Sequence, residues 1–158
     1  MQKITPSLWF NMNAEEAISF YSSIFKNSKV TDKSYYGEGS PIPAGTLLAA
    51  TFHLEGQEFL AINAGPQFPF TEAISFTVYC ETQEEVDYYW SKLTADGGKE
   101  VQCGWLKDKF GLSWQITPTI MSKFLSDPDK EKSGRAMQAM MKMVKLDIAA
   151  LEKAFNGK

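Results

Sequence analysis

The stretches NAEEAISFY (residues 13–21) and TQEEVDYYW (residues 82–90) are two versions of one helix start, 69 residues apart. Each begins with a residue suited to a helix N-cap, Asn13 or Thr82, and continues with two glutamates in the first turn. Negative charge is favoured there because the helix dipole is positive at its N-terminus. The recurrence predicts an internal repeat, which is typical of duplicated modules packed about a pseudo-twofold axis.

Strands are predicted on both sides of each helix, because short alternating apolar segments indicate strands with one buried face. In the first half these segments are 4–11, 28–36, 45–54 and the residues after Gly56; in the second they are 73–80, a hairpin around Gly104 and the residues after Gly111. Each half therefore has the order strand, helix, three strands (βαβββ). The predicted organisation is a first module at 1–63, a linker at 64–72, a second module at 73–118 and a helical extension at 119–158, together forming one structural domain.

The extension after Thr117 has a helical pattern. Residues 119–126 predict one or two helical turns, and Asp127-Pro128 predicts the start of a helix with the aspartate as its cap. Apolar residues then recur at spacings of four and three, which predicts one buried stripe formed by Met137, Met141, Val144, Ile148, Leu151 and Phe155. Asp147 is also suited to cap a separate last helix, so a break near 145–147 is the alternative. We interpret the stripe as core packing or a dimer contact rather than as a methionine-rich peptide-binding surface.

Composition excludes several classes of protein. With 44% hydrophobic and 22% charged residues, the chain has the balance of a globular domain. The net charge of −3 argues against nucleic acid as the main partner, because phosphate binding needs a basic surplus. The N-terminus lacks the pattern of a signal peptide, and no apolar run is long enough to span a membrane. We therefore expect a cytoplasmic protein that binds neither membrane nor nucleic acid, with Cys80 and Cys103 as reduced thiols.

His53 is the single histidine, which excludes sites that need two or three imidazoles. It lies near the end of a predicted strand, and Glu55 follows two residues later on the same face. A base or a lone metal ligand at this position is conceivable. A hydrogen-bonded or surface histidine is the interpretation we favour, since no cluster of partners accompanies it.

The repeat also resembles a known superfamily. The tandem pattern, with AEEAISFY after the first strand and DKFGLSWQI at the last, resembles the vicinal-oxygen-chelate superfamily of glyoxalase I, ring-cleaving dioxygenases and bleomycin-resistance proteins. More narrowly, 75–93, 103–116 and 135–155 resemble the PhnB-like family, also labelled 3-demethylubiquinone-9 3-methyltransferase domains. The resemblance implies an α+β fold in which tandem βαβββ modules form a cupped eight-stranded mixed sheet, plus C-terminal helices. It also implies a homodimer.

The resemblance allows the metal question to be asked position by position. The metal enzymes of this superfamily carry histidine, glutamine or glutamate at four positions on the first and last strands of each module. The matching positions here are Ala73, Gln115, Leu60 and one residue within 5–7. Alanine and leucine cannot coordinate a metal, and one neutral amide holds a divalent ion poorly. We therefore expect no metal and no cofactor.

A small-molecule pocket is expected on the strand faces turned away from the helices, which form the inside of the cup. The alternation of side chains along the strands predicts nine ligand-binding residues, and Trp105 in the hairpin is a tenth. The predicted residues are Ser7, Trp9, Leu60, Ile62, Ser75, Thr77, Tyr79, Trp105, Ser113 and Gln115. Hydroxyl and amide groups from one module and apolar and aromatic groups from the other suit a small, uncharged, partly aromatic ligand. The alternatives are a merely hydrated Ser/Thr face and a Trp105 that stacks on a dimer partner or plugs the sheet edge. Asp108 is expected to hydrogen-bond the turn at Gly111.

Three hypotheses for function remain open. The first, which we favour, is a metal-independent small-molecule-binding protein of the bleomycin-resistance kind. The second is an enzyme on the same scaffold, a lyase, isomerase or methyltransferase. It would use Gln115, His53 or Tyr79 with chemistry supplied by the substrate, or would recruit a metal through unexpected ligands. The third is an interaction module whose methionine-rich tail binds a partner protein. The segment NMNAEEA after the first strand has no glycine, unlike the phosphate-type loop of doubly wound nucleotide-binding folds, so we interpret the methyltransferase label as a family name.

Overall fold

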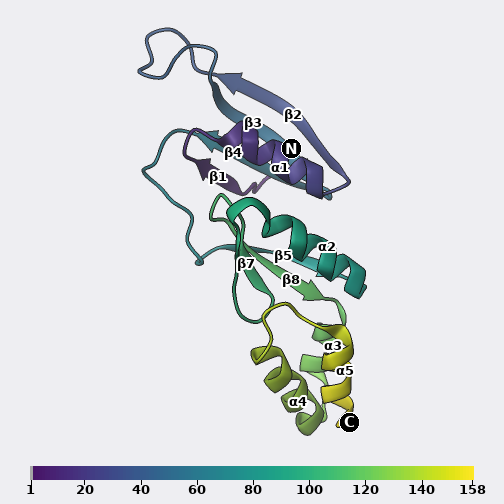
Figure 1. Cartoon of the computed structure of the whole chain (residues 1–158). Coiled ribbons are helices and arrows are strands. Elements are labelled where there is room, and N and C mark those ends of the chain that lie inside the picture. The colour runs from purple at the N-terminus through teal and green to yellow at the C-terminus, as the bar shows by residue number, and fades with distance from the viewer. Residues whose placement is uncertain (1) are drawn as a thin grey trace. The chain divides into compact units, whose positions relative to one another are not determined.

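The computed structural model describes residues 2–158 and consists of two compact units, Met1–Phe70 and Thr71–Lys158. The first unit contains, in chain order, β1 (Ser7–Phe10), α1 (Ala14–Ile24), β2 (Ser28–Tyr35), β3 (Leu47–Leu54) and β4 (Gln57–Asn63) (Figure 1). The second contains β5 (Ser75–Cys80), α2 (Gln83–Leu93), a 3₁₀ turn (Ala95–Gly97), β6 (Lys99–Glu100), β7 (Trp105–Lys107), β8 (Ser113–Pro118), α3 (Ile120–Ser126), α4 (Lys130–Met141) and α5 (Ile148–Asn156). The predicted α+β fold of two βαβββ modules followed by C-terminal helices is confirmed. Within residues 2–158 the eight strands are hydrogen-bonded as two sheets of four.

The first sheet has the strand order β1-β4-β3-β2, in which β1 is parallel to β4 and the other pairs are antiparallel. Parallel strands cannot be joined by a tight turn, so the chain crosses over through α1, which packs against β3 and β4. One sheet face is thereby buried under the helix. The core residues on this side are Leu8, Phe10, Ala17, Ile18, Tyr21, Phe52, Phe59 and Ala61.

The second sheet repeats this topology with the order β5-β8-β7-β6, in which β5 is parallel to β8. Here α2 is the crossover helix, and it packs against β5, β7 and β8. The side chains buried between helix and sheet are Cys80, Val86, Trp90, Leu93, Leu106, Trp114 and Ile116. The repeat detected in the sequence is therefore a repeat of topology and of core placement.

The two helix starts are capped differently. Thr82 is the N-cap of α2 as predicted: its hydroxyl accepts the Glu85 N–H at 3.3 Å, and the Glu85 carboxylate accepts the Glu81 N–H at 2.7 Å. Asn13 is at the N-cap position of α1 as predicted, but its side chain makes no capping bond.

The start of α1 is capped from the end of β4 instead. The buried Asn63 amide oxygen accepts the Ala14 N–H at 3.1 Å, while its NH₂ group donates to the Leu47 carbonyl at 2.9 Å. One amide therefore satisfies a free helix N–H and ties β4 to β3.

The tail is three helices rather than one apolar stripe. α4 ends at Met141, and Asp147 caps α5 by accepting the Ala150 N–H at 2.8 Å, so the alternative break near 145–147 is confirmed. The single stripe is wrong, because Met137 and Met141 are 46% and 62% exposed.

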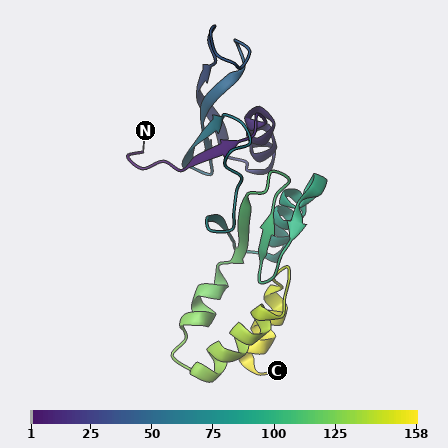
Figure 2. The same ribbon diagram turned by 90° about the vertical axis from the view of Figure 1, so that its left-hand side faces the viewer.

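The cap of α4 is also displaced from the prediction. Asp129, rather than Asp127, accepts the Glu131 and Lys132 N–H groups, because Pro128 precedes the cap instead of following it. The three helices share a small core of their own, formed by Met121, Phe124, Ala136, Leu146, Leu151 and Phe155. Figure 2 shows α4 and α5 packed side by side near the C-terminus.

The connection between α4 and α5 attaches these helices to the second module. The Cys103 and Gly104 N–H groups donate to the carbonyls of Met143 and Val144, both at 2.8 Å. On the other side, the Gln83 amide donates to the Leu146 carbonyl at 3.2 Å and accepts the Ile148 N–H at 2.9 Å. Gly104 has a φ of +81°, and a Cβ there would lie 3.0 Å from Leu146 and from the Ile116 carbonyl. Only glycine fits this turn without strain.

Two glycine substitutions should therefore change stability in opposite directions. We expect Gly104→Ala to lower the free energy of unfolding by about 2 kcal/mol, through left-handed strain and overlap with Leu146. Gly134→Ala, inside α4 with open space around its Cα, should raise it by about 0.5–1 kcal/mol. Urea unfolding of both variants followed by circular dichroism measures this. Equal effects of the two substitutions would contradict the assignment of Gly104 as a docking turn.

Candidate functional site

Each sheet has one face covered by its helix and one open face, as the alternation of side chains predicts. In the first sheet, Ser7 lies opposite Leu60 and Trp9 opposite Ile62 across the β1–β4 pair. All four side chains are on the open face, because their strand neighbours Leu8 and Phe10 are in the helix-side core. Ser7 is exposed, and the other three are half-buried. The structure thus brings together the four residues that were predicted for this module.

The segment after β4 covers part of this face, which sequence reasoning did not anticipate. The Trp9 indole N–H donates to the Gly65 carbonyl at 2.9 Å, and the Phe68 ring meets the indole edge-on with centroids 4.8 Å apart. Phe70 meets Phe10 at 5.4 Å on the other face of β1. Residues 65–70 therefore straddle the β1 edge, and Trp9 already has an aromatic neighbour.

The open face of the second sheet is mainly polar. Ser75 lies opposite Ser113, Thr77 opposite Gln115 and Trp105 opposite Gln115, so the predicted residues from three strands share one face. Tyr79 is on the same face and is 69% exposed. The Gln115 amide donates to the Ser75 hydroxyl at 2.9 Å, which orients both groups.

Ser113 differs from its neighbours because it is only 1% exposed and its hydroxyl has no hydrogen-bond partner within residues 2–158. An unpaired buried hydroxyl costs about 1–3 kcal/mol, so such groups are rare and call for an explanation. Its cross-strand neighbours are Ser75 and Lys107. Lys107 forms an ion pair with Glu72, which neutralises the charge at this end of the face.

The turn before β8 holds this face in place. The buried Asp108 carboxylate accepts the N–H groups of Phe110 and Leu112 at 2.9 and 3.1 Å and the Trp114 indole N–H at 2.9 Å. The Asp108 carbonyl accepts the Gly111 N–H at 2.9 Å. The predicted structural role of Asp108 at this turn is confirmed. By holding the turn, Asp108 fixes the start of β8, the strand that carries Ser113 and Gln115.

The positions at which related enzymes hold a metal do not fit a divalent ion here. Leu60 and Ala73 have no donor atom, Ser7 offers one neutral hydroxyl, and Gln115, whose NH₂ group donates to Ser75, offers one neutral amide oxygen. In the described part of the chain, no three His, Cys, Asp or Glu side chains are grouped in a way that could hold a metal. No step of a proposed activity can therefore be assigned to a bound metal at these positions.

His53 has a carboxylate partner that the sequence did not reveal. Its Nε2 lies 3.4 Å from Oε2 of Glu58, the residue directly opposite on β4. The expected neighbour Glu55 instead accepts the Asn27 side-chain N–H at 2.8 Å. Glu58 is 6% exposed, and it also accepts the Thr5 hydroxyl at 2.9 Å and the Gln2 N–H at 3.2 Å.

These contacts hold the pKa of Glu58 below its ordinary value. The main cause is the hydrogen bond from Thr5, with further contributions from the Gln2 N–H and from His53, and desolvation opposes them. In the sequence, the pairing of His53 with Glu58 is indicated only by the predicted hairpin. Residues five apart across a two-residue turn face each other in such a hairpin.

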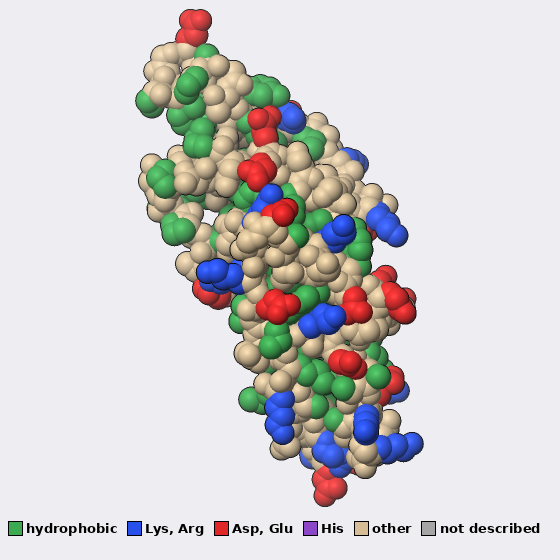
Figure 3. Space-filling model, in the orientation of Figure 1, with side chains coloured by type: hydrophobic (Ala, Val, Ile, Leu, Met, Phe, Trp, Pro, Cys, Tyr) green, Lys and Arg blue, Asp and Glu red, His purple; other side chains and the backbone are tan. Residues whose placement is uncertain are grey.

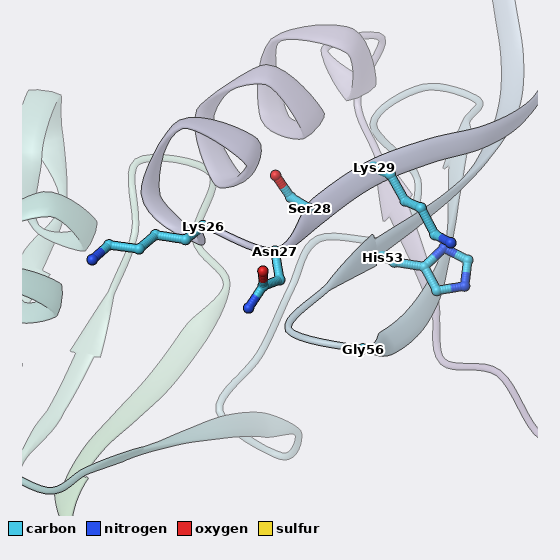
Figure 4. Close-up of a pocket in the computed structure, with 6 residues that line it drawn as sticks. All are labelled: Lys26, Asn27, Ser28, Lys29, His53 and Gly56. Carbon is cyan, nitrogen blue, oxygen red and sulfur yellow. The ribbon is translucent and has the colours of Figure 1, made fainter.

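A pocket of about 560 Å³ lies beside His53, where α1 leads into β2. It is lined by Lys26, Asn27, Ser28, Lys29, His53 and Gly56. Figure 4 shows the Lys29 side chain ending beside the imidazole of His53, whereas Lys26 extends in the opposite direction. Of the two lysines in the lining, Lys29 is the one that brings its ammonium group to the imidazole.

Cys80 is a buried thiol in the core of the second unit, and burial raises its pKa to about 12. The thiolate is the reactive form of cysteine, so Cys80 is not a nucleophile at neutral pH.

Solved structures of other proteins have a similar fold. The fold is that of the genomically encoded fosfomycin resistance protein from Listeria monocytogenes, with a TM-score of 0.56 at 16% identity over 80% of this chain and 98% of that one. A protein from Pseudomonas aeruginosa gives a TM-score of 0.59 at 22% identity over 75% and 98%. The α+β fold of this chain, which its resemblance to the vicinal-oxygen-chelate superfamily implied, is therefore found in these structures as well.

The chain belongs to the family described as 3-demethylubiquinone-9 3-methyltransferase, whose model matches residues 2–117. A putative 3-demethylubiquinone-9 3-methyltransferase, PhnB protein, from Bacillus cereus is 43% identical over 75% of this chain and 100% of that one, with a TM-score of 0.68. The matched range ends before the tail, so residues 135–155 lie outside the family match that was expected to include them. No curated protein matches the chain.

The pH dependence of stability should report the Glu58 contacts. Because the folded-state pKa lies below the ordinary 4.5, ionised Glu58 stabilises the fold above about pH 4.5, and this stabilisation is lost as the pH falls through the folded-state pKa. We expect Glu58→Gln to have a lower urea midpoint than the unmodified protein at pH 7, with the gap narrowing between pH 5 and pH 3. Glu152→Gln, at an exposed position of α5, is the control and should change the midpoint little. A gap for Glu58→Gln that stays constant over this range would contradict the prediction.

Proposed function

We propose that this protein binds a small organic molecule without the aid of a metal ion, on the open face of the second sheet. The observation that carries the proposal is the combination of a sealed, unpaired Ser113 hydroxyl with the exposed Thr77 and Tyr79 on the same face. Solvent reaches one end of this face, and a hydrogen-bonding group without a partner lies at the other. Pockets for small molecules combine a few such polar groups with apolar walls.

The ligand is uncharged and partly aromatic. The polar groups that line the face are hydroxyls and an amide, and the nearby ammonium of Lys107 is already paired with Glu72. Such groups recognise carbonyl and hydroxyl oxygens rather than a net charge. Trp105 and Tyr79 on the same face supply flat apolar surface against which a ring can stack. Trp9, Leu60 and Ile62 of the first module are of the same apolar kind.

An enzyme on the same scaffold is the second candidate, and the description of the family favours it by naming a methyltransferase. The residues available for such chemistry are Gln115, His53 and Tyr79. Against a nucleotide-type methyl donor site, β1 leads into α1 through Asn11–Asn13 without a glycine that would admit a phosphate or a carboxylate close to the backbone. Turnover of a bound ligand is therefore the observation that separates the two candidates.

The remaining expectations are part of the proposal. We expect a homodimer in the cytoplasm that binds neither nucleic acid nor membrane. Both cysteines are free, which suits a reducing compartment. On the face that Figure 3 shows, basic and acidic side chains lie among one another over most of the chain, with more basic than acidic ones at the C-terminal end. Among the described residues, no helix is long and apolar enough to cross a membrane.

Metal content is the first check of this proposal. Protein purified without an affinity tag should contain well under one divalent ion per chain, because three of the four candidate positions offer at most a hydroxyl. Treatment with a chelator should leave the melting temperature unchanged. Elemental analysis by mass spectrometry measures the metal. Close to one ion per chain, lost together with stability on chelation, would overturn the metal-independent assignment.

A ligand screen checks the binding face. In the presence of a chelator, small aromatic amides, ketones and phenols are screened by thermal shift, and a ligand at a hundred times its Kd should raise stability by about 2.7 kcal/mol. Gln115→Leu and Ser113→Ala should abolish most of that shift. Ser91→Ala, on an exposed part of α2, is the matched control and should preserve it. A hit whose shift survives both face substitutions would contradict the assigned site, and chemical conversion of a hit, followed by NMR, would favour the enzyme.

A further inference from the structure

The two ring nitrogens of His53 are in different situations. Nε2 faces the Glu58 carboxylate at 3.4 Å. Nδ1 is shielded from solvent and has no hydrogen-bond partner within residues 2–158. A shielded ring nitrogen without a partner is unfavourable, so it indicates either strain or a partner that arrives from outside the chain.

Glu58 holds the imidazole in this orientation. Its carboxylate is itself held by the Thr5 hydroxyl and the Gln2 N–H, and it is almost fully buried. A fixed carboxylate selects the form of histidine that carries a proton on the facing nitrogen. Nε2 therefore keeps its proton toward Glu58, and Nδ1 remains available on the other side of the ring. Nδ1 is a donor when the imidazole is protonated and an acceptor when it is neutral.

The side chains around the adjacent pocket select for negative charge. His53 lines this pocket together with two lysines, an amide and a hydroxyl. Lys29 pairs with His53 across β2 and β3, and Figure 4 shows its ammonium next to the imidazole. The nearest carboxylate on the adjoining turn, Glu55, is engaged by Asn27 through both its backbone and its side-chain N–H groups. Lys26 points away from the imidazole, and the N–H groups of Asn27 and the hydroxyl of Ser28 already donate to Glu55 and to the Ser22 carbonyl, so the positive charge beside His53 comes from Lys29. An ammonium group forms short, strong bonds with oxyanions.

We propose that this pocket is a binding site for a small oxyanion of the phosphate class, with Lys29 supplying charge and Nδ1 of His53 supplying a directional hydrogen bond. Phosphate is favoured over a carboxylate because it retains a proton near neutral pH and can both donate to Nδ1 and accept from it, whereas a carboxylate only accepts. The site is separate from the proposed ligand face of the second sheet and does not depend on it. It belongs entirely to the first unit, in which Glu58 and His53 share the open face of the sheet with Leu60.

The single histidine makes the test direct, because ¹⁵N-labelled protein gives one imidazole signal pair that needs no assignment by mutation. Inorganic phosphate is titrated in while sodium chloride keeps the ionic strength constant, and the Nδ1 resonance is followed. We expect a saturable shift of Nδ1 larger than that of Nε2. Acetate should bind at least several times more weakly than phosphate.

Matched variants distinguish specific phosphate binding in the pocket from a non-specific effect of the protein's positive charge. Lys29→Met should weaken phosphate binding about tenfold, whereas Lys123→Met, which removes one exposed charge from α3, should leave it unchanged. His53→Asn, followed by ³¹P line broadening because the probe is lost, should weaken binding to a similar degree as Lys29→Met. A shift that chloride reproduces, that does not saturate, or that both lysine variants reduce equally would overturn the proposal. Acetate binding as tight as that of phosphate would overturn the assignment to the phosphate class.

Discussion

The parallel pairing of the first and last strand in each module is the constraint on which the rest of the structure depends. β1 with β4 and β5 with β8 run in the same direction, so neither pair can be closed by a hairpin. The crossover helix must return over one face of its sheet, and it buries that face. The other face then has no cover from its own module's helix, and this is where the predicted ligand-binding residues lie. The division into a core face and an open face follows from this strand order.

Buried polar side chains form the second level of organisation. Asn63 caps α1 and ties β4 to β3, Asp108 shapes the turn before β8, and Gln83 attaches the tail through two bonds to the α4–α5 connection. Each of these groups is satisfied on both sides, so each acts as an anchor. Within residues 2–158, the Ser113 hydroxyl and the His53 Nδ1 are shielded but unpaired, as is the Asn13 amide oxygen at the start of α1. The contrast between satisfied and unsatisfied polar groups directs attention to two surfaces that the fold does not itself require.

The sequence predicted the elements more reliably than their partners. The repeat, both crossover helices, the Thr82 cap, the Asp108 turn and the alternation of faces could all be predicted, because each depends on residues close together in the chain. The local pattern predicts a side-chain cap from Asn13, but the Ala14 N–H is bound by Asn63, about fifty residues away. Strand alternation places Glu55 on the same face as His53, but the hairpin register brings Glu58 opposite the imidazole. Both contacts depend on long-range register, which local patterns do not encode.

Hydrophobic periodicity also predicted the tail incorrectly. The regular apolar spacing continues through the break between α4 and α5, and it includes methionines that are exposed. By itself, the sequence determined the repeat, the α+β class, the faces of the strands and the lack of a donor atom at Ala73 and Leu60, two of the four matched ligand positions. Those features follow from residue type and short-range spacing. Only the tertiary structure decided which polar groups are paired across strands, that residues 65–70 cover Trp9, and that Glu58 holds His53 beside a basic pocket. The physical reason is that hydrogen bonds and burial are satisfied by whichever residues the strand register brings together, however far apart they lie in the chain.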